Sequence, residues 1–317
     1  MTPDNAGISP ALVETIAGLS AGSVATLAVH PLDIVKTRMQ IHRSSAANPQ
    51  SLTTISLLRT LTRTPHPIAA LYRGLTPNLI GNASSWASFF FFKARAEQAI
   101  LNLKGPTGTG SSDAASLSPQ DYFVASAVAG IFTQAITNPV WVLKTRMLSS
   151  NRGAAGAYPS MWAGAAQLLK TEGWRGFYRG LGISLFGVSH GAVQFTVYDP
   201  LKKMYIARVR KSSSGNRDQE PQRFSNEATL VISSISKLVA GAVTYPYQVI
   251  RSRLQNYNAD ERFGRGIRGV VRRTWREEGW RGFYRGIVPG VVRVMPATWV
   301  TFLVYENMKF YLPRWAS

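Results

Sequence analysis

The chain has 317 residues, 45% of them hydrophobic, and its 36 Lys and Arg against 16 Asp and Glu give a formal net charge of +20. Such an excess indicates a polyanionic partner, either nucleic acid or an anionic membrane surface. Because long apolar stretches separate the basic residues, the membrane is the better interpretation. The chain has no Cys, which excludes disulfide frameworks and zinc–thiolate sites.

Two motifs recur three times in the same order. The nonapeptide EGWRGFYRG occupies residues 172–180 and 278–286, and a shortened copy, LYRG, occupies residues 71–74. A proline motif of the type PLDIVKTR precedes each copy, and it begins at Pro31, Pro139 and Pro246. The repeats predict one body built from three tandem units, at residues 1–106, 107–220 and 221–317.

Each unit offers two segments long enough to cross a hydrocarbon core of about 30 Å. They lie at residues 11–40, 77–100, 120–149, 183–207, 226–255 and 288–312. Polar residues at helical spacing give each segment a stripe that faces water or a bundle interior. Short amphipathic stretches, expected to lie flat at the membrane surface, follow at residues 52–62, 159–171 and 266–276.

The remaining parts of the chain are read as connections. Residues 101–118 and 208–224 are rich in small or charged residues and are expected to be linkers between the units. Residues 1–10 contain neither a basic residue nor an apolar run, so a signal peptide or a cleavable transit peptide is not expected.

The proline motif followed by Glu-Gly and aromatic-Arg-Gly, in triplicate, resembles the mitochondrial carrier family over essentially the whole chain. The resemblance implies an all-α membrane protein with six transmembrane helices in a pseudo-threefold barrel and a short matrix-side amphipathic helix in each repeat. It implies solute transport by alternating access in the inner mitochondrial membrane, both termini toward the intermembrane space, and no enzymatic activity. A closed bundle needs no partner subunit, so a monomer is expected.

By the family pattern, the odd-numbered transmembrane helices supply a gate on the matrix side. Its expected residues are Asp33, Lys36, Gln40, Lys144, Arg251 and Gln255. The third motif position is acidic in the family pattern, but here it holds Asp33, Trp141 and Gln248. Only Asp33 and Lys144 are therefore expected to form an ion pair, and the gate is expected to be weak.

The even-numbered helices supply a cytoplasmic gate and a lipid site in the same pattern. The cytoplasmic gate is expected at Asp199, Lys202, Glu306 and Lys309, with Asp199 and Lys309 as the pair. The aromatic-Arg-Gly elements open the even helices, whose N-terminal amides favour phosphate, and by resemblance cardiolipin binds there. These residues are Tyr72, Arg73, Gly74, Tyr178, Arg179, Gly180, Tyr284, Arg285 and Gly286.

Family members contact substrate seven and eight residues after each of these elements. Those positions hold Gly81, Asn82, Gly187, Val188, Arg293 and Val294. Arg293 can hold a phosphate or carboxylate in bidentate fashion, and Gly187 is expected to leave room for a flat base.

Four more side chains are expected at the substrate site: Trp86 to stack on an aromatic ring, His190 and Gln194 to bond a heterocycle, and Lys237 as a cavity charge. The alternatives are packing for Trp86, a structural hydrogen bond for His190 and a snorkelling surface lysine at position 237.

Several segments point to one branch of the family. The sequence Asn-Pro-Val-Trp at 138–141 and residues 189–195, 244–248 and 293–297 resemble the FAD/folate carriers, although the Pro-x-Trp feature is shared with NAD and pyrimidine-nucleotide carriers. FAD or a related flavin is the expected substrate, transported and not held as a prosthetic group, and folate is the second choice.

Two other functional classes fit the sequence less well. A basic nucleic-acid-binding protein does not explain six apolar segments. A membrane enzyme would need catalytic or metal-ligating groups, and the four His are scattered without suitable spacing. No metal and no nucleic acid are therefore expected.

Overall fold

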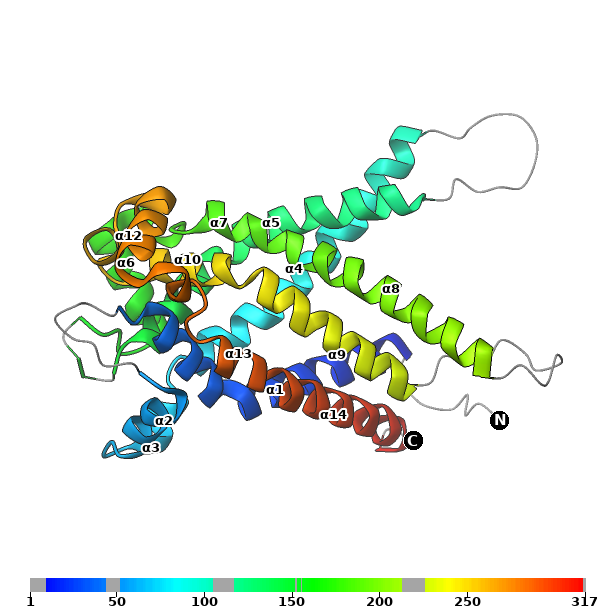
Figure 1. Cartoon of the computed structure of the whole chain (residues 1–317), viewed down its shortest axis with the longest axis horizontal. Coiled ribbons are helices and arrows are strands. Elements are labelled where there is room, and N and C mark those ends of the chain that lie inside the picture. The colour runs from blue at the N-terminus through cyan, green and yellow to red at the C-terminus, as the bar shows by residue number, and fades with distance from the viewer. Residues whose placement is uncertain are drawn as a thin grey trace.

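The computed structural model describes residues 10–43, 52–104, 117–151, 153–154, 156–212 and 226–315. These residues form helices and connecting turns, with no strand among them. The long helical segments run side by side, and the short helices within residues 54–71, 161–177 and 259–282, called the short helices below, gather at one end of the bundle (Figure 1). The chain is an all-α protein of pseudo-threefold design, as the repeats predict.

The three units repeat the same order of elements. The first contains α1 (Pro10–Ile41), α2 (Thr54–Thr62), α3 (Pro67–Leu71) and α4 (Leu75–Lys104). The second contains α5 (Pro119–Ser149), α6 (Met161–Phe177), α7 (Leu181–Leu185), the 3-10 turn η1 (Phe186–Val188) and α8 (Ser189–Ser212). The third contains α9 (Asn226–Val243), α10 (Tyr245–Gln255), α11 (Ala259–Phe263), α12 (Gly266–Gly282), α13 (Ile287–Val292) and α14 (Val294–Trp315).

The short helices α2, α6 and α12 confirm the three predicted amphipathic stretches. Side-chain caps explain where the first two begin, because Thr53 Oγ1 accepts from the amide of Ser56 and Ser160 Oγ accepts from the amide of Ala163, each at 3.2 Å. The predicted linkers at 101–118 and 208–224 lie largely outside the described residues.

Three of the six predicted spans are interrupted. The breaks fall at Gly187 within η1, at Thr244 and at Arg293. Pro246 and Pro296 explain two of them, because proline has no N–H for the carbonyl four residues earlier. Pro31 and Pro139, in contrast, lie inside the continuous helices α1 and α5.

The outer faces of the long helices are apolar. Among the described residues, three helical segments are long and apolar enough to cross a membrane: Val13–Ile41, Gln120–Ser149 and Ile287–Leu312. Large exposed side chains such as Phe123 and Trp299 lie on these segments. Such apolar surface is stable against lipid tails but not in water.

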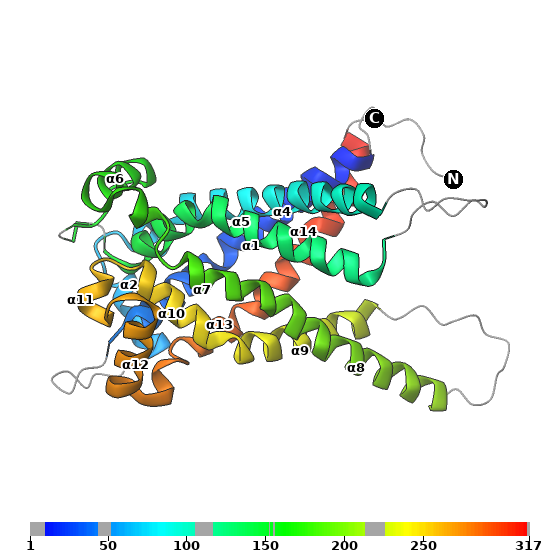
Figure 2. The same cartoon turned by 90° about the horizontal axis from the view of Figure 1, so that it is seen from above.

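The units close into a ring through their long helices. α4 packs against α5, α8 against α9, and α14 against α1, so that each contact joins one unit to the next (Figure 2). The beginning of α1 and the end of α14 lie together at the end of the bundle opposite the short helices.

An arginine at the end of each proline motif crosses to the neighbouring unit. The three bonds are Arg38 Nε to the Leu148 carbonyl at 3.1 Å, Arg146 Nε to the Gln255 carbonyl at 3.1 Å and Arg253 Nε to the Gln40 carbonyl at 3.0 Å. The last carbonyls of a helix lack an intrahelical partner. Each guanidinium therefore satisfies the end of the next helix, and the three together close the ring.

The residue before each proline ties the kinked helix to the aromatic-Arg-Gly element of its own unit. His30 Nε2 donates to the Arg73 carbonyl at 3.1 Å. Asn138 Nδ2 donates to the Phe177 carbonyl at 2.7 Å, and the Tyr245 hydroxyl donates to the Arg285 carbonyl at 3.1 Å. Side chains of three different types thus make one equivalent connection.

Carboxylates from the nonapeptides neutralise two of the ring arginines. Arg146 pairs with Glu172 at 2.6 Å, and Arg253 pairs with Glu278 at 2.9 Å. Side-chain exposure is 1% for Arg253 and 2% for Glu278, so this second pair is withdrawn from water. Position 66 holds His in the first unit, so Arg38 has no equivalent acid.

The Glu278→Gln substitution should lower the free energy of unfolding by about 3–5 kcal/mol, because it leaves a buried guanidinium charge uncompensated. Thermal unfolding of the detergent-purified protein measures the effect as a lower Tm. The matched control is Glu277→Gln, since the neighbouring Glu277 pairs with the partly exposed Arg43 at 2.5 Å. That substitution should cost about 1 kcal/mol or less, and equal Tm losses in the two variants would contradict the prediction.

Candidate functional site

Three adjoining cavities lie between the long helices and meet at Arg293. The first, of about 270 Å³, lies among the proline motifs and is called the floor cavity here. The second, of about 120 Å³, adjoins it between α9, α10 and α13. The third, of about 450 Å³, runs along α1 from Asp33 to Gly18 and is called the upper cavity. Fifteen helical residues correspond to about 22 Å, so the upper cavity is elongated.

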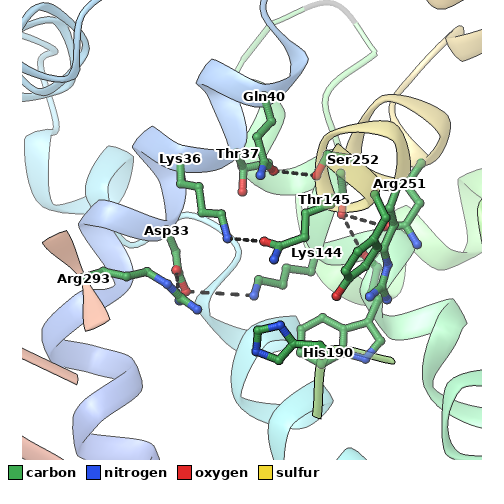
Figure 3. Close-up of a pocket in the computed structure, with 14 residues that line it drawn as sticks. Asp33, Lys36, Thr37, Gln40, Lys144, Thr145, His190, Arg251, Ser252 and Arg293 are labelled. Atoms are coloured by element: carbon green, nitrogen blue, oxygen red, sulfur yellow. Dashed lines mark hydrogen bonds and ion pairs between the residues drawn. The ribbon is translucent and has the colours of Figure 1, made fainter. Parts of the chain in front are cut away.

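Asp33 is the carboxylate of the floor cavity, and Figure 3 shows it between Arg293 and Lys144. Its Oδ1 accepts a hydrogen bond from Arg293 Nη1. Its Oδ2 accepts from the buried Asn78 at 3.3 Å and lies 4.0 Å from Lys144 Nζ. The expected pair with Lys144 is therefore present at long distance, but the closer partner is Arg293, which the sequence analysis assigned to the substrate alone.

The other two cations of the floor cavity have no carboxylate partner among the described residues. Lys36 Nζ donates to Gln248 Oε1 at 2.9 Å and lies 5.6 Å from the centre of the Tyr245 ring. The Arg251 guanidinium lies 5.9 Å from the Trp141 ring, and Lys144 Nζ lies 4.7 Å from the same ring. An aromatic face and an amide thus stand where the family pattern has acids.

Gln40 and Gln255 connect neighbouring helices at the wall of the floor cavity. Gln40 Nε2 donates to the Tyr245 hydroxyl at 3.2 Å, while Ser252 Oγ donates to Gln40 Oε1 at 2.7 Å (Figure 3). Gln255 Oε1 accepts from Thr145 Oγ1 at 3.0 Å. Both amides line the floor cavity together with the charged side chains.

The upper cavity is lined by polar groups of α1 and α4, with one cation from α9 on its wall. Asn82 Nδ2 donates to Thr26 Oγ1 at 3.1 Å. Trp86 also lines this cavity, 63% exposed and stacked on Phe90 at 5.8 Å between ring centres. Lys237 lines both the upper cavity and the smaller one beside it. Val294 follows Arg293 on the same walls.

Two expected substrate contacts are occupied by the protein itself. A Cβ added at Gly187 would lie 3.2 Å from the Tyr247 hydroxyl, and one added at Gly81 would lie 3.3 Å from Val140 and 3.4 Å from the Trp141 ring. The space that Gly187 was expected to leave for a flat base is therefore taken by Tyr247. Aromatic side chains of the proline motifs explain the glycines at both positions.

The remaining expected substrate residues on α8 and η1 are less involved. His190 Nδ1 lies 2.9 Å from Thr244 Oγ1, while its ring lines the floor cavity. Gln194 is half-buried and lines none of the three cavities. The side chain of Val188 lies outside the described residues.

The expected cytoplasmic pair is not formed in this conformation. Lys309 Nζ lies 2.6 Å from Glu14 Oε1 on α1, and the Tyr305 hydroxyl donates to the same carboxylate. Asp199 is exposed, and its expected pair with Lys309 is absent from the described structure. The sequence analysis paired only the even helices and therefore missed Glu14. Lys202 lies 6.0 Å from the Tyr198 ring, and Glu306 is exposed.

The arginines of the three aromatic-Arg-Gly elements bond to neighbouring units, and they differ in how far they are buried. Arg73 is buried and donates to the Met147 carbonyl at 2.8 Å and the Tyr158 carbonyl at 3.1 Å. Arg179 pairs with Asp260 at 2.8 Å, and Arg285 donates to the His42 carbonyl at 3.2 Å. Each contact reaches the next unit, so these arginines fasten the ring and leave the backbone amides as the groups available to a phosphate.

The glycines and tyrosines of these elements lie at the same junctions. Gly74, Gly180 and Gly286 have φ of 75°, 74° and 79°, which only glycine adopts without strain. Tyr178 and Tyr72 are partly exposed, at 45% and 36%, and Tyr284 stacks on Tyr245 at 6.2 Å.

Besides Glu14, four further residues were not expected from the sequence. The ring arginines Arg38, Arg146 and Arg253 carried a signal, because an Arg ends all three proline motifs. Asn78 carried none, since nothing in the sequence shows that an amide meets Asp33.

The Gly187→Ala substitution should reduce the solute transport expected from the sequence several-fold, because the new methyl group displaces the Tyr247 hydroxyl. Solute uptake into proteoliposomes measures this loss. Gly191→Ala, one turn further along, is the matched control, since a Cβ there meets nothing within 4 Å. Equal rates for the two variants would show that the contact between Gly187 and Tyr247 does not matter.

Comparison with known proteins places the chain in a family. The family model described as "Mitochondrial carrier protein" matches residues 9–103, 115–209 and 222–314. The mitochondrial FAD carrier protein FLX1 of Saccharomyces cerevisiae is 37% identical over 96% of this chain and 98% of its own length. Folate transporter 1, chloroplastic, of Arabidopsis thaliana is 35% identical over 92% of each chain.

A third relative carries a different substrate name. Nicotinamide adenine dinucleotide transporter 2, mitochondrial, of Arabidopsis thaliana is 32% identical over 92% of this chain and 77% of its own length. Members of the matched family are transporters and not enzymes. With its three repeats, its helical ring and its full-length relatives, the chain belongs to the mitochondrial carrier family.

Proposed function

We infer that this chain transports FAD, or a related flavin, across the inner mitochondrial membrane. The observation that carries the proposal is the match along nearly the full chain to a relative named as an FAD carrier. The cavities agree with such a cargo, since Trp86 offers a ring surface in the upper cavity and Arg293 offers a fork for an anionic group. FAD is cargo here and not a prosthetic group.

The arrangement of charges supports alternating access. The floor contacts of Asp33 close the end near the short helices, while Lys309 is held by Glu14 away from Asp199. Transport in this proposal exchanges these two arrangements: the floor contacts open, and Lys309 moves to Asp199. The short helices then lie in the matrix and both termini face the intermembrane space.

The lipid partner, the oligomeric state and the unit boundaries belong to the same proposal. Cardiolipin phosphates bind backbone amides at the starts of α4, α7 and α13, directly after the aromatic-Arg-Gly elements. The ring closes without a second copy, which supports a monomer. Unit boundaries after residues 106 and 220 fall in the gaps between the three family matches.

Uptake by proteoliposomes tests the cargo. Purified protein should take up labelled FAD faster than folate, NAD or pyrimidine nucleotides, and FAD should raise the Tm of the detergent-solubilised protein by mass action. Preferred uptake of folate would support the second choice, which the similarity to a folate transporter favours. Preferred uptake of NAD would overturn the flavin assignment and leave the carrier function intact.

The Arg293→Ala variant tests the site. FAD uptake should fall at least tenfold, because the variant loses the cationic fork that all three cavities share. The control is Arg59→Ala, which removes an exposed arginine from α2, remote from the cavities. If Arg293→Ala transported at the unaltered rate, the assignment of this residue to the substrate would be wrong.

A further inference from the structure

The floor cavity holds more positive than negative charge. Four cationic side chains line it, Lys36, Lys144, Arg251 and Arg293, and Asp33 is the one carboxylate among its described lining residues (Figure 3). Arg293 and Lys144 share this carboxylate. Two cations are therefore left without an anionic partner.

The two remaining cations have only neutral contacts. Lys36 is bonded to the amide oxygen of Gln248. Arg251 faces the ring of Trp141, and its Nη2 atom is shielded from solvent without a hydrogen-bond partner among the described residues. Gln248 and Arg251 lie three residues apart on α10, which places them on one helix face. The Lys36 ammonium group, held on Gln248, is thus directed to the same side of the cavity as Arg251.

Neutral contacts compensate such charges only in part. A charge withdrawn from water loses its hydration. A cation–π contact and a single hydrogen bond to a neutral amide each restore only part of that loss. A ligand with two adjacent negative charges would complete the neutralisation.

We propose that the floor cavity is a subsite for the diphosphate bridge of a dinucleotide, held by Lys36, Arg251 and Arg293. The proposal rests on the proposed function and deepens it, because it assigns one chemical group of the cargo to one compartment. Cations from three elements surround this space: α1, α10 and the turn between α13 and α14. Tetrahedral phosphates direct oxygens to several cations at once, whereas a carboxylate presents one planar edge.

The position of the floor cavity fits the rest of such a molecule. Arg293, Lys144 and Trp141 line both the floor cavity and the upper cavity, so the two spaces adjoin. With the diphosphate on the floor, one ring system reaches Trp86 and Asn82 in the upper cavity. Trp141 lines both compartments.

The test measures binding of inorganic pyrophosphate by thermal unfolding, separately from transport. Pyrophosphate should raise the Tm of the detergent-purified protein, whereas sodium sulfate at equal ionic strength should not. Gln248→Glu supplies Lys36 with a carboxylate, and Arg251→Gln removes a cation, so each variant should need at least tenfold more pyrophosphate for half of the shift. Lys170→Gln removes an exposed lysine on α6 and should stay within twofold of the unaltered protein.

A second experiment tests the subsite by measuring uptake of three flavins. FAD carries the diphosphate, FMN carries one phosphate and riboflavin carries none. The unaltered protein should prefer FAD, and Arg251→Gln should raise the KM for FAD at least tenfold while leaving that for riboflavin within twofold. A Tm within a few degrees of the unaltered protein, without ligand, shows that each variant is folded.

The outcomes separate the subsite from the cargo. Uptake of FAD with no pyrophosphate binding, or with unchanged binding in both variants, would overturn the subsite and leave the flavin proposal standing. Pyrophosphate binding together with uptake of NAD in place of FAD would support the subsite and overturn the flavin proposal. Folate uptake without pyrophosphate binding would overturn both.

Discussion

The structure depends on three arginines that each hold the end of a neighbouring helix. Arg38, Arg146 and Arg253 donate to carbonyls of the next unit, and the last of them returns to the first unit. Without these bonds, three helix ends would expose unpaired carbonyls at the crowded end of the bundle. The ring therefore needs these three cations to close. Glu172 and Glu278 of the nonapeptides pair with Arg146 and Arg253, so neither carboxylate is available to the floor cavity.

This division of charge defines the candidate site. Glu172 and Glu278 pair with ring arginines. Asp33 is the carboxylate among the described lining residues of the floor cavity. Aromatic side chains complete the wall there: Trp141 fits beside Gly81 and Tyr247 beside Gly187. The glycines of α4 and η1 thus fit the aromatic side chains of the proline motifs. The floor cavity keeps its positive charge, which suits an anionic cargo.

The repeats made most of the fold predictable, because a motif present three times locates equivalent helices and surface stretches. Features that depend on non-local partners were not predictable. The break at Arg293 follows from Pro296, but its consequence, a bond to Asp33, requires knowledge of where α1 lies. Likewise, Glu14 holds Lys309 only because α1 and α14 are neighbours. Similarly, Gly187 was expected to leave space for a flat base, but the Tyr247 side chain occupies that space.

The excess of cations at the floor also has an electrical consequence. One elementary charge that crosses a potential of 100 mV changes in energy by about 2.3 kcal/mol. An empty floor is strongly positive, whereas a floor loaded with a dianion is much less so. The membrane potential therefore acts more strongly on the return of the empty carrier than on the loaded step. Energised and uncoupled mitochondria would then differ mainly in how fast the empty protein resets.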